Sequence, residues 1–181
     1  FYPAMQAAHI LFPQFHSGKH ISVVPVGIDQ DPFIRLTRDI SENFNFEKPA
    51  ALHAKFVPSL YGGTKMSGSE TSNSVIFLSD SEKEVEKKIR KYAFSGGKPT
   101  IEEHRKKGGN PDIDVSFQYL KFFFEPDDKK LEEIERKYRK GEMLTSELKE
   151  ILIEKISLFL KEHQKEREKA RSKVDKFILK D

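Results

Sequence analysis

The sequence predicts an α/β fold over residues 1–80 and an all-helical part over residues 81–181. Strand-like and helical segments alternate with short links in the first part, which is the order of a parallel sheet. Residues 1–80 hold 6 Lys or Arg and 7 Asp or Glu, whereas residues 81–181 hold 26 and 22. Charge density therefore rises roughly threefold, as expected where solvated helix faces begin. We place the domain boundary between residues 80 and 81.

The first part is expected to begin with a short helix over residues 3–9. Residues 21–28 then form a near-continuous apolar run, typical of a strand buried on both faces of a parallel sheet. Pro25 counts against the interior of a central strand, unless it lies near the strand's end. A turn follows, where Asp31 can cap a helix and Pro32 suits its first turn. That helix has apolar residues at helical spacing, which predict a core-facing stripe. The stripe consists of Phe33, Leu36, Ile40 and Phe44.

A second strand is predicted over residues 52–57. Ligands of parallel sheets bind beyond the carboxyl ends of the strands. Asp29 and Gln30 follow the first strand, and a lysine-containing loop follows the second. We therefore expect these three features to face one crevice.

The second part carries helix signals throughout. Helices are predicted over residues 82–93, 100–108, 127–140 and from 145 onward, with Thr145 as the cap of the last. Two apolar stripes are expected to face the core. They consist of Val115, Tyr119, Phe122 and Phe123, and of Leu148, Leu152, Ile156, Phe159 and Leu160.

The loop over residues 62–69, Gly-Gly-Thr-Lys-Met-Ser-Gly-Ser, combines backbone freedom with a mobile positive charge. Glycines allow N–H groups to turn toward an anion, and Lys65 brings its ammonium to the same place. This combination suits a polyphosphate. The spacing is not that of a P-loop, so an ordinary nucleotide-hydrolysing site is disfavoured. The alternative to a polyphosphate-binding loop is a flexible surface loop without a ligand.

Composition excludes several classes of protein. The chain has no cysteine, which rules out disulfides, zinc–cysteine sites and thiol catalysis. No apolar run approaches the ~20 residues that a membrane-spanning helix needs, and no signal peptide is evident, so we expect a cytoplasmic protein without a membrane partner. The first residue is Phe1, and we interpret the chain as a piece of a longer polypeptide.

Several motifs, in order, resemble one family. They are Tyr2-Pro3-Ala4-Met5-Gln6, Gly27-Ile28-Asp29-Gln30-Asp31-Pro32, Lys65-Met66-Ser67-Gly68-Ser69, Ala93-Phe94-Ser95-Gly96-Gly97, Glu103-His104-Arg105, Gly108-Gly109-Asn110, Asp114-Val115 and Tyr119-Leu120. Together they resemble the archaeal and eukaryotic type of tryptophanyl-tRNA synthetase, a class I aminoacyl-tRNA synthetase, over most of the chain. The family's N-terminal histidine–glycine signature, which binds ATP, is not in this sequence. The resemblance implies the second half of a Rossmann-like catalytic domain followed by an all-α anticodon-binding domain, with the isolated chain inactive.

The same resemblance implies ATP-dependent activation of L-tryptophan and its transfer to tRNA(Trp). ATP with its Mg²⁺ would be a substrate, no tightly bound protein metal is expected, and the family is homodimeric. Lys65 would contact the departing pyrophosphate, Ser67 would bind phosphate oxygens, and Met66 would present its backbone to the adenine. Gly68 replaces the second lysine of the class-wide motif, so Lys65 carries more of the catalysis.

Substrate contacts are implied at the sheet turn and the first helix. Asp29 would accept hydrogen bonds from the ribose hydroxyls, and Gln30 would contact the ammonium or carbonyl of the amino acid. Gln6, with Tyr2 one turn earlier on the same face, would bind the substrate ammonium. Val26 and Gly27 would line the pocket. The alternative is that Asp29 caps a helix and Gln6 is a surface residue.

Weaker candidates remain. Arg35 and Arg38 would meet tRNA phosphates or pair with Asp31 or Asp39, and Lys98 would contact the anticodon. His53 is interpreted as a core histidine. A buried polar network is expected to include His104, Arg105 and Asp114.

Two other functions stay open. A tyrosyl-tRNA synthetase shares the class I fold and the Tyr…Gln helix. A non-catalytic tRNA-binding module is the alternative of a different kind.

Overall fold

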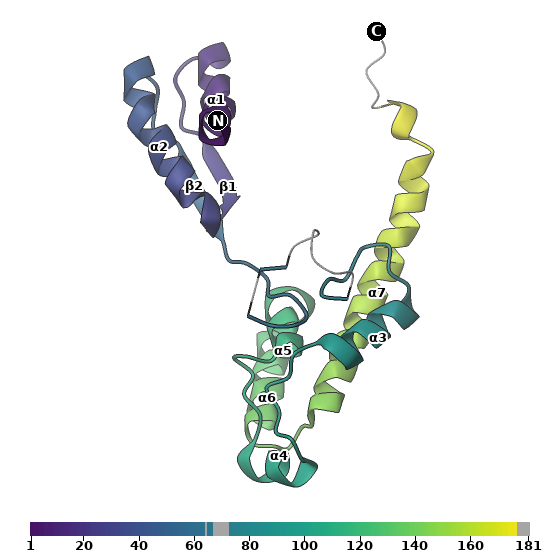
Figure 1. Ribbon diagram of the computed structural model, residues 1–181. Helices are drawn as coiled ribbons and strands as arrows, with labels where there is room; N and C mark the ends of the chain where they lie inside the picture. The colour runs from purple at the N-terminus through teal and green to yellow at the C-terminus, as the bar shows by residue number, and fades with distance from the viewer. Residues whose placement is uncertain (64, 67–72, 177–181) are drawn as a thin grey trace. The chain divides into compact units, whose positions relative to one another are not determined.

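The computed structural model describes residues 1–63, 65–66 and 73–176 and separates two compact units. Unit 1 is Phe1–Phe56 and unit 2 is Val57–Asp181 (Figure 1). The sequence had placed its domain boundary between residues 80 and 81. The packing boundary lies earlier because the described residues of 57–80 pack on the helices of unit 2. Leu60 is fully buried in that core, and Met66 and Ile76 pack against it.

Unit 1 is an α/β unit. Its elements are α1 (Tyr2–Ser17), β1 (Val23–Gly27), the 3₁₀ turn η1 (Ile28–Gln30), α2 (Asp31–Ser41), the 3₁₀ turn η2 (Glu42–Phe44) and β2 (Ala50–Ala54). β1 and β2 pair in parallel, from Val23 opposite Ala50 to Gly27 opposite Ala54. The parallel strand–helix–strand order is confirmed. The first helix is longer than the expected residues 3–9, since it continues through Pro13.

The expectation that the first strand is buried on both faces is wrong within unit 1. Val24 and Val26 are half-buried, whereas Val23 is 65% exposed. This alternation means that one face of the strand is covered within the unit. Pro25 lies inside β1, opposite Leu52. It is tolerated because, among the described residues, β1 has a hydrogen-bonded neighbour on one side only.

The predicted apolar stripe of α2 is only partly correct. Leu36 and Phe44 are 43% and 60% exposed. The buried face carries Ile34, Thr37 and Ser41 instead. The two hydroxyls bond back to the carbonyls of Phe33 and Thr37 at 2.7 Å, so they are buried with their hydrogen bonds satisfied. Small polar residues thus allow α2 to contact α1 closely. Asp31 is the first helical residue rather than the cap, because η1 precedes it.

Unit 2 is helical. Its elements are α3 (Glu82–Tyr92), α4 (Ile101–Lys107), α5 (Val115–Tyr119), the π-helical turn η3 (Leu120–Phe124), α6 (Asp128–Arg139), α7 (Thr145–Arg171) and the 3₁₀ turn η4 (Val174–Lys176). The long helix α7 contacts α3, α5, η3 and α6 (Figure 1). The predicted helices are therefore present, with ends that differ by a few residues. Thr145 opens α7, and the capping position is Leu144, whose N–H donates to Glu147 Oε2 at 2.6 Å.

In the stripe predicted from Val115 to Phe123, the last two residues do not face the core, and the π-helical turn η3 explains why. Glu125 N–H donates to Leu120 O at 2.9 Å, a five-residue step that shifts the helical register. Phe122 and Phe123 are consequently 45% and 60% exposed, while Phe117 is buried together with Leu120. In α7 the prediction is confirmed except at Phe159, which is 48% exposed, whereas Ile153 is 9% exposed.

Candidate functional site

Unit 1 places three of the predicted site residues around the end of β1. Gly27 ends the strand, and η1 carries Asp29 and Gln30 directly after it. The Asp29 carboxylate folds back over Gly27, so a Cβ at Gly27 would lie 2.8 Å from Asp29 Oδ1 and 3.2 Å from Phe56 Cε1. The missing side chain at residue 27 is what leaves room for the carboxylate. Val26, which is half-buried, precedes it on the strand.

The first turn of α1 joins this cluster. The Tyr2 hydroxyl donates to Gln30 Oε1 at 3.3 Å, and the Tyr2 ring packs edge-on against Phe33 with centroids 5.5 Å apart. Gln6 lies four residues further along α1, on the face that carries Tyr2. Within the described part of the chain, Gln6 Oε1 is buried without a hydrogen-bond partner. A buried amide oxygen left unpaired is costly, and a donor such as an ammonium would satisfy it.

The charged residues of α2 pair locally. Arg35 Nε lies 2.6 Å from Asp31 Oδ2, and His53 Nε2 lies 3.1 Å from Asp31 Oδ1. His53 is therefore not a core histidine, because its side chain is 31% exposed and lies beside Asp31 at the start of α2. Arg38 reaches the carbonyl of Pro49 at 3.5 Å. Of the two roles considered for Arg35, the structure shows the ion pair.

Lys65 and Met66 lie in unit 2 on the described part of the lysine loop. Lys65 is exposed and forms an antiparallel bridge with Pro58, and Met66 N–H donates to Val57 O at 2.8 Å. Met66 therefore cannot offer that N–H to a base, which leaves its carbonyl. The Met66 side chain lines an apolar cavity of about 190 Å³ together with Val57 and Tyr119. Ser67 lies outside the described residues.

The common crevice expected for Asp29, Gln30 and Lys65 stays a prediction. The first two residues belong to unit 1 and the lysine to unit 2.

The glycine turn after α3 is built into a buried polar network. Asp114 is fully buried, caps α5, and accepts from Gly96 N–H at 2.8 Å and from the Tyr138 hydroxyl at 2.7 Å. Tyr138 also contacts Thr145 Oγ1 at 2.9 Å. Burial, together with the negative charge of Asp114, raises the pKa of Tyr138. Sequence reasoning found Asp114 but missed Tyr138.

The remaining network residues connect α4 to the turn before α7. His104 is buried and its Nε2 lies 2.9 Å from Met143 O, while Arg105 Nη1 donates to Gly141 O at 2.9 Å. The polar network predicted around His104, Arg105 and Asp114 is confirmed, although Arg105 itself is exposed. Lys98 lies on the surface beside a cavity of about 170 Å³ lined also by His104.

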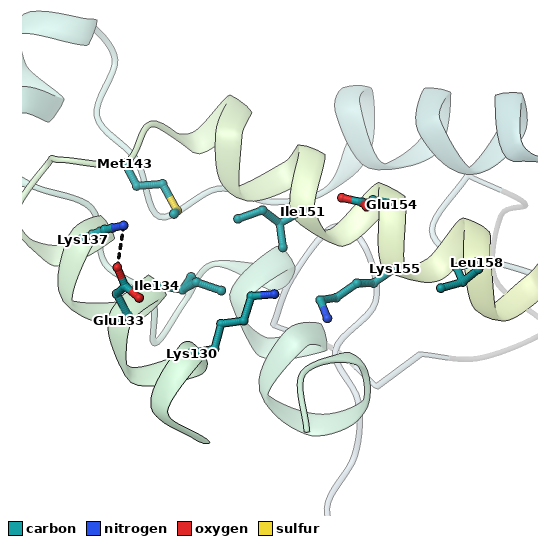
Figure 2. A pocket seen from close by; sticks show the side chains of 9 residues that line it. All are labelled: Lys130, Glu133, Ile134, Lys137, Met143, Ile151, Glu154, Lys155 and Leu158. Carbon is teal, nitrogen blue, oxygen red and sulfur yellow. Dashed lines mark ion pairs between the residues drawn. The ribbon is translucent and has the colours of Figure 1, made fainter. Parts of the chain in front are cut away.

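A larger cavity of about 360 Å³ lies between α6 and α7. Figure 2 shows Lys130 from α6 and Lys155 from α7 reaching into the same space, with Lys137 paired to Glu133 at 2.7 Å. Both of the first two lysines face the buried carboxylate of Glu125, at 3.6 Å and 3.0 Å. Acidic and basic groups are thus balanced around this cavity, so it has no strong preference for an anion.

Replacing Lys155 with methionine is expected to lower the free energy of unfolding by about 1–3 kcal/mol at pH 7, because Glu125 would lose the nearer of its two lysine partners. Burial alone raises the pKa of Glu125, but the bonds from Lys155 and Asp127 N–H and the lysine charges outweigh it and lower the pKa. The wild-type contribution is therefore present above the carboxyl's unfolded pKa and lost as pH falls through the folded value. Urea titrations between pH 3 and pH 7 should show a shallower acid loss in Lys155→Met. The control Lys130→Met removes a longer, more exposed contact and should cost less than ~1 kcal/mol. Equal losses in the two variants would contradict this.

No helix within residues 1–63 or 73–176 is both long and apolar enough to cross a membrane. In the same described residues, no cluster of three or more His, Asp or Glu side chains is arranged to hold a metal ion.

The chain belongs to the class I tRNA synthetases, since the family "tRNA synthetases class I (W and Y)" matches residues 1–161. Its similar relatives specify the branch. It is 53% identical over 97% of its length to a protein of Sulfurisphaera tokodaii named tryptophan–tRNA ligase, of which it covers 45%. It is 49% identical over 98% of its length to the human cytoplasmic tryptophan–tRNA ligase, of which it covers 39%. The chain thus spans less than half of the curated relatives it matches.

Solved structures favour the same branch. The chain superposes on the tryptophanyl-tRNA synthetase of Aeropyrum pernix with a TM-score of 0.87 at 38% identity, covering 94% of this chain and 47% of that one. The tyrosyl-tRNA synthetase of the same organism gives a TM-score of 0.70 at 25% identity, covering 88% and 46%. Both share the class I fold, and the tryptophan branch is the nearer.

Proposed function

We propose that this chain forms the C-terminal half of the catalytic domain and the anticodon-binding helical domain of a tryptophan–tRNA ligase. The whole protein would activate L-tryptophan with ATP and Mg²⁺ and transfer it to tRNA(Trp). The support is that two relatives named tryptophan–tRNA ligase are 53% and 49% identical to this chain over nearly all of its length. The division of function at residues 1–80 and 81–181 is proposed from the rise in charge density at residue 81, and it differs from the packing boundary after Phe56. A homodimer is proposed from the family resemblance, and a cytoplasmic location from the name of the human relative.

The observation that carries the proposal is the polar cluster at the end of β1. Tyr2 donates a hydrogen bond to Gln30, and on the same helix the buried amide oxygen of Gln6 has no partner among the described residues. An amino-acid ammonium is a donor of the kind that such an oxygen lacks. Gln6 and Gln30 would therefore bind the amino-acid end of the substrate.

Asp29 would take the ribose of ATP, since a carboxylate accepts hydrogen bonds from two hydroxyls. Lys65 would contact the leaving pyrophosphate, with Ser67 on phosphate oxygens and the Met66 carbonyl toward the adenine. Lys98 would contact the anticodon, beside the cavity next to His104. For Arg35 the pair with Asp31 is formed, so a tRNA contact there would have to compete with it.

Replacing Gly27 with alanine should raise the KM for ATP by about tenfold, because the added methyl displaces the Asp29 carboxylate and loses about one charged hydrogen bond. The displaced atom is the end of a flexible side chain, so the change in stability should stay below ~1 kcal/mol. Steady-state kinetics with ATP and with tryptophan varied in turn check this. The KM for tryptophan serves as the internal control and should change less than that for ATP. An unchanged KM for ATP would remove Asp29 from the ribose site.

The function is tested by charging total tRNA with labelled tryptophan or labelled tyrosine, using the full-length protein. Charging with tryptophan, saturating at the level of tRNA(Trp), is the expected result. Charging with tyrosine would favour the tyrosyl branch. Binding of tRNA without charging would favour a non-catalytic module.

A further inference from the structure

We propose that Tyr119 and Lys88, two side chains of the helical unit, are positioning residues that hold Lys65 in its working place. The inference rests on the function proposed above for Lys65. Neither residue carries a substrate contact in that proposal. Both are buried polar groups whose hydrogen bonds end on the two stems of the lysine loop, the stem before it at residues 57–60 and the stem after it at residues 73–80.

Tyr119 holds the first stem. Its hydroxyl donates to the carbonyl of Pro58 at 2.8 Å, and Pro58 is the bridge partner of Lys65. Tyr119 is 3% exposed, and burial raises the pKa of its hydroxyl, which therefore stays a neutral donor. The carbonyl that accepts this bond belongs to Pro58, the residue that forms the backbone bridge with Lys65. Loss of the bond would free that segment where it meets the lysine.

Lys88 holds the second stem. Its ammonium donates to the carbonyl of Val75 at 3.0 Å and to Asp80 Oδ2 at 2.6 Å, with both side chains about nine-tenths buried. The same ammonium lies 4.8 Å from the centre of the Phe77 ring, and Phe77 N–H donates to Asp80. One side chain of α3 thereby fixes three residues of the returning stem.

The two stems are joined to each other and to the helices. Leu60 N–H donates to Ser74 O at 2.8 Å, and Phe94 N–H donates to Leu60 O at 2.7 Å. Displacement of the second stem is therefore passed to the first, and so to Pro58 and Lys65. Phe94 also accepts from Val115 N–H at 3.1 Å, which ties the stems to the start of α5.

This arrangement is more than packing requires. A buried ion pair contributes little net stability compared with well-packed apolar side chains, but it defines geometry sharply. A catalytic group displaced by about 1 Å loses much of its effect. Holding Lys65 to that tolerance is a role that Lys88 and Tyr119 can fill without touching the substrate.

The test compares Lys88→Met and Tyr119→Phe with the control Lys149→Met in the full-length protein. Lys149 Nζ also donates to a backbone carbonyl, that of Arg90 at 3.2 Å, but this carbonyl lies on α3, away from the loop stems. Two readouts are taken. One is the KM for ATP and the kcat of tryptophan-dependent pyrophosphate exchange. The other is hydrogen exchange of the Met66 amide, which is bonded to Val57.

Both variants should raise the KM for ATP or lower kcat by about tenfold, the value of one hydrogen bond, with the KM for tryptophan changed less than twofold. Exchange at the Met66 amide should accelerate in both, while the control keeps wild-type values of each. The inference would be overturned if neither variant changed the hydrogen exchange of the Met66 amide or the kinetics with ATP. It would also be overturned if Lys149→Met changed these two quantities as much as the variants do. If the wild-type protein shows no pyrophosphate exchange with tryptophan, the proposed function fails. Hydrogen exchange of the Met66 amide then still decides whether Tyr119 and Lys88 hold the loop.

Discussion

Replacing Lys65 with alanine should reduce tryptophan-dependent pyrophosphate exchange by roughly 10²–10³-fold, the usual cost of removing one group that stabilises developing charge. In the proposed reaction negative charge would gather on the departing pyrophosphate, and Lys65 is an exposed cation in the glycine-containing loop. Gly68 stands where the class motif has its second lysine, so no neighbouring lysine in this motif can replace the lost charge. The reduction should appear in kcat as well as in kcat/KM, because the proposed contact would strengthen in the transition state.

The matched control is Lys83→Ala, which removes an exposed lysine from α3. It should keep wild-type exchange kinetics. A Lys65→Ala variant with exchange within twofold of the wild type would exclude Lys65 from the catalytic step.

Replacing Gly108 with alanine should destabilise unit 2 by more than ~4 kcal/mol, a loss large enough to need a specific cause. Gly108 ends α4 with φ +70° and ψ 171°, a conformation used almost only by glycine. A Cβ there would lie 1.7 Å from the backbone oxygen of Arg139 at the end of α6. Backbone cannot move aside as a side-chain tip can, so α4 and α6 would have to separate.

The control variant Gly18→Ala introduces a side chain at a similar left-handed backbone conformation but without a clash, so it measures the backbone strain alone. Gly18 follows α1 with φ +83° and ψ 176°, and apart from its chain neighbours no described residue has an atom within 4 Å of the position a Cβ would take. Its replacement should cost only the strain, about 1–3 kcal/mol. Hydrogen exchange of amides in the buried helices of each unit measures the loss in that unit. The amides of residues 18 and 108, which donate to the carbonyls of Gln14 and His104, report only the local opening of a helix end. Similar losses at both sites would mean that the contact with Arg139 is relaxed at little cost.

Local patterns predicted the elements better than the faces they bury. The parallel strand–helix–strand order and the helices of unit 2 follow from apolar spacing and caps. The α2 stripe failed because Thr37 and Ser41 bond to the helix backbone and can then be buried. The stripe at Phe122 and Phe123 failed because a π turn shifts the register, which a 3.6-residue period does not anticipate. Both errors arise from backbone hydrogen bonding, which a hydrophobic pattern does not contain.

In the candidate site, too, some residues are predicted from the sequence and others are not. Asp29, Gln30, Gln6 and Lys65 are candidates because their motifs resemble a family, and their roles stay predictions. The structure gives Gly27 a physical reason to be small. Tyr119 and Lys88 were not found as supports of the loop. Tyr119 donates to a backbone carbonyl 61 residues away, and Lys88 donates to one 13 residues away as well as to the Asp80 carboxylate. A carbonyl carries no sequence signal, and one Lys and one Asp among many charged residues do not indicate a pair. The prediction that His53 is a core histidine is wrong because its partner, Asp31, lies on α2, and the apolar residues around His53 in the sequence do not indicate that contact.

Amino-acid-dependent exchange of labelled pyrophosphate into ATP, measured on the full-length protein with tryptophan and tyrosine offered separately, tests the proposed function most directly. We expect exchange with tryptophan and none above background with tyrosine. Exchange driven by tyrosine, or by neither amino acid, would contradict the assignment of this chain to a tryptophan–tRNA ligase.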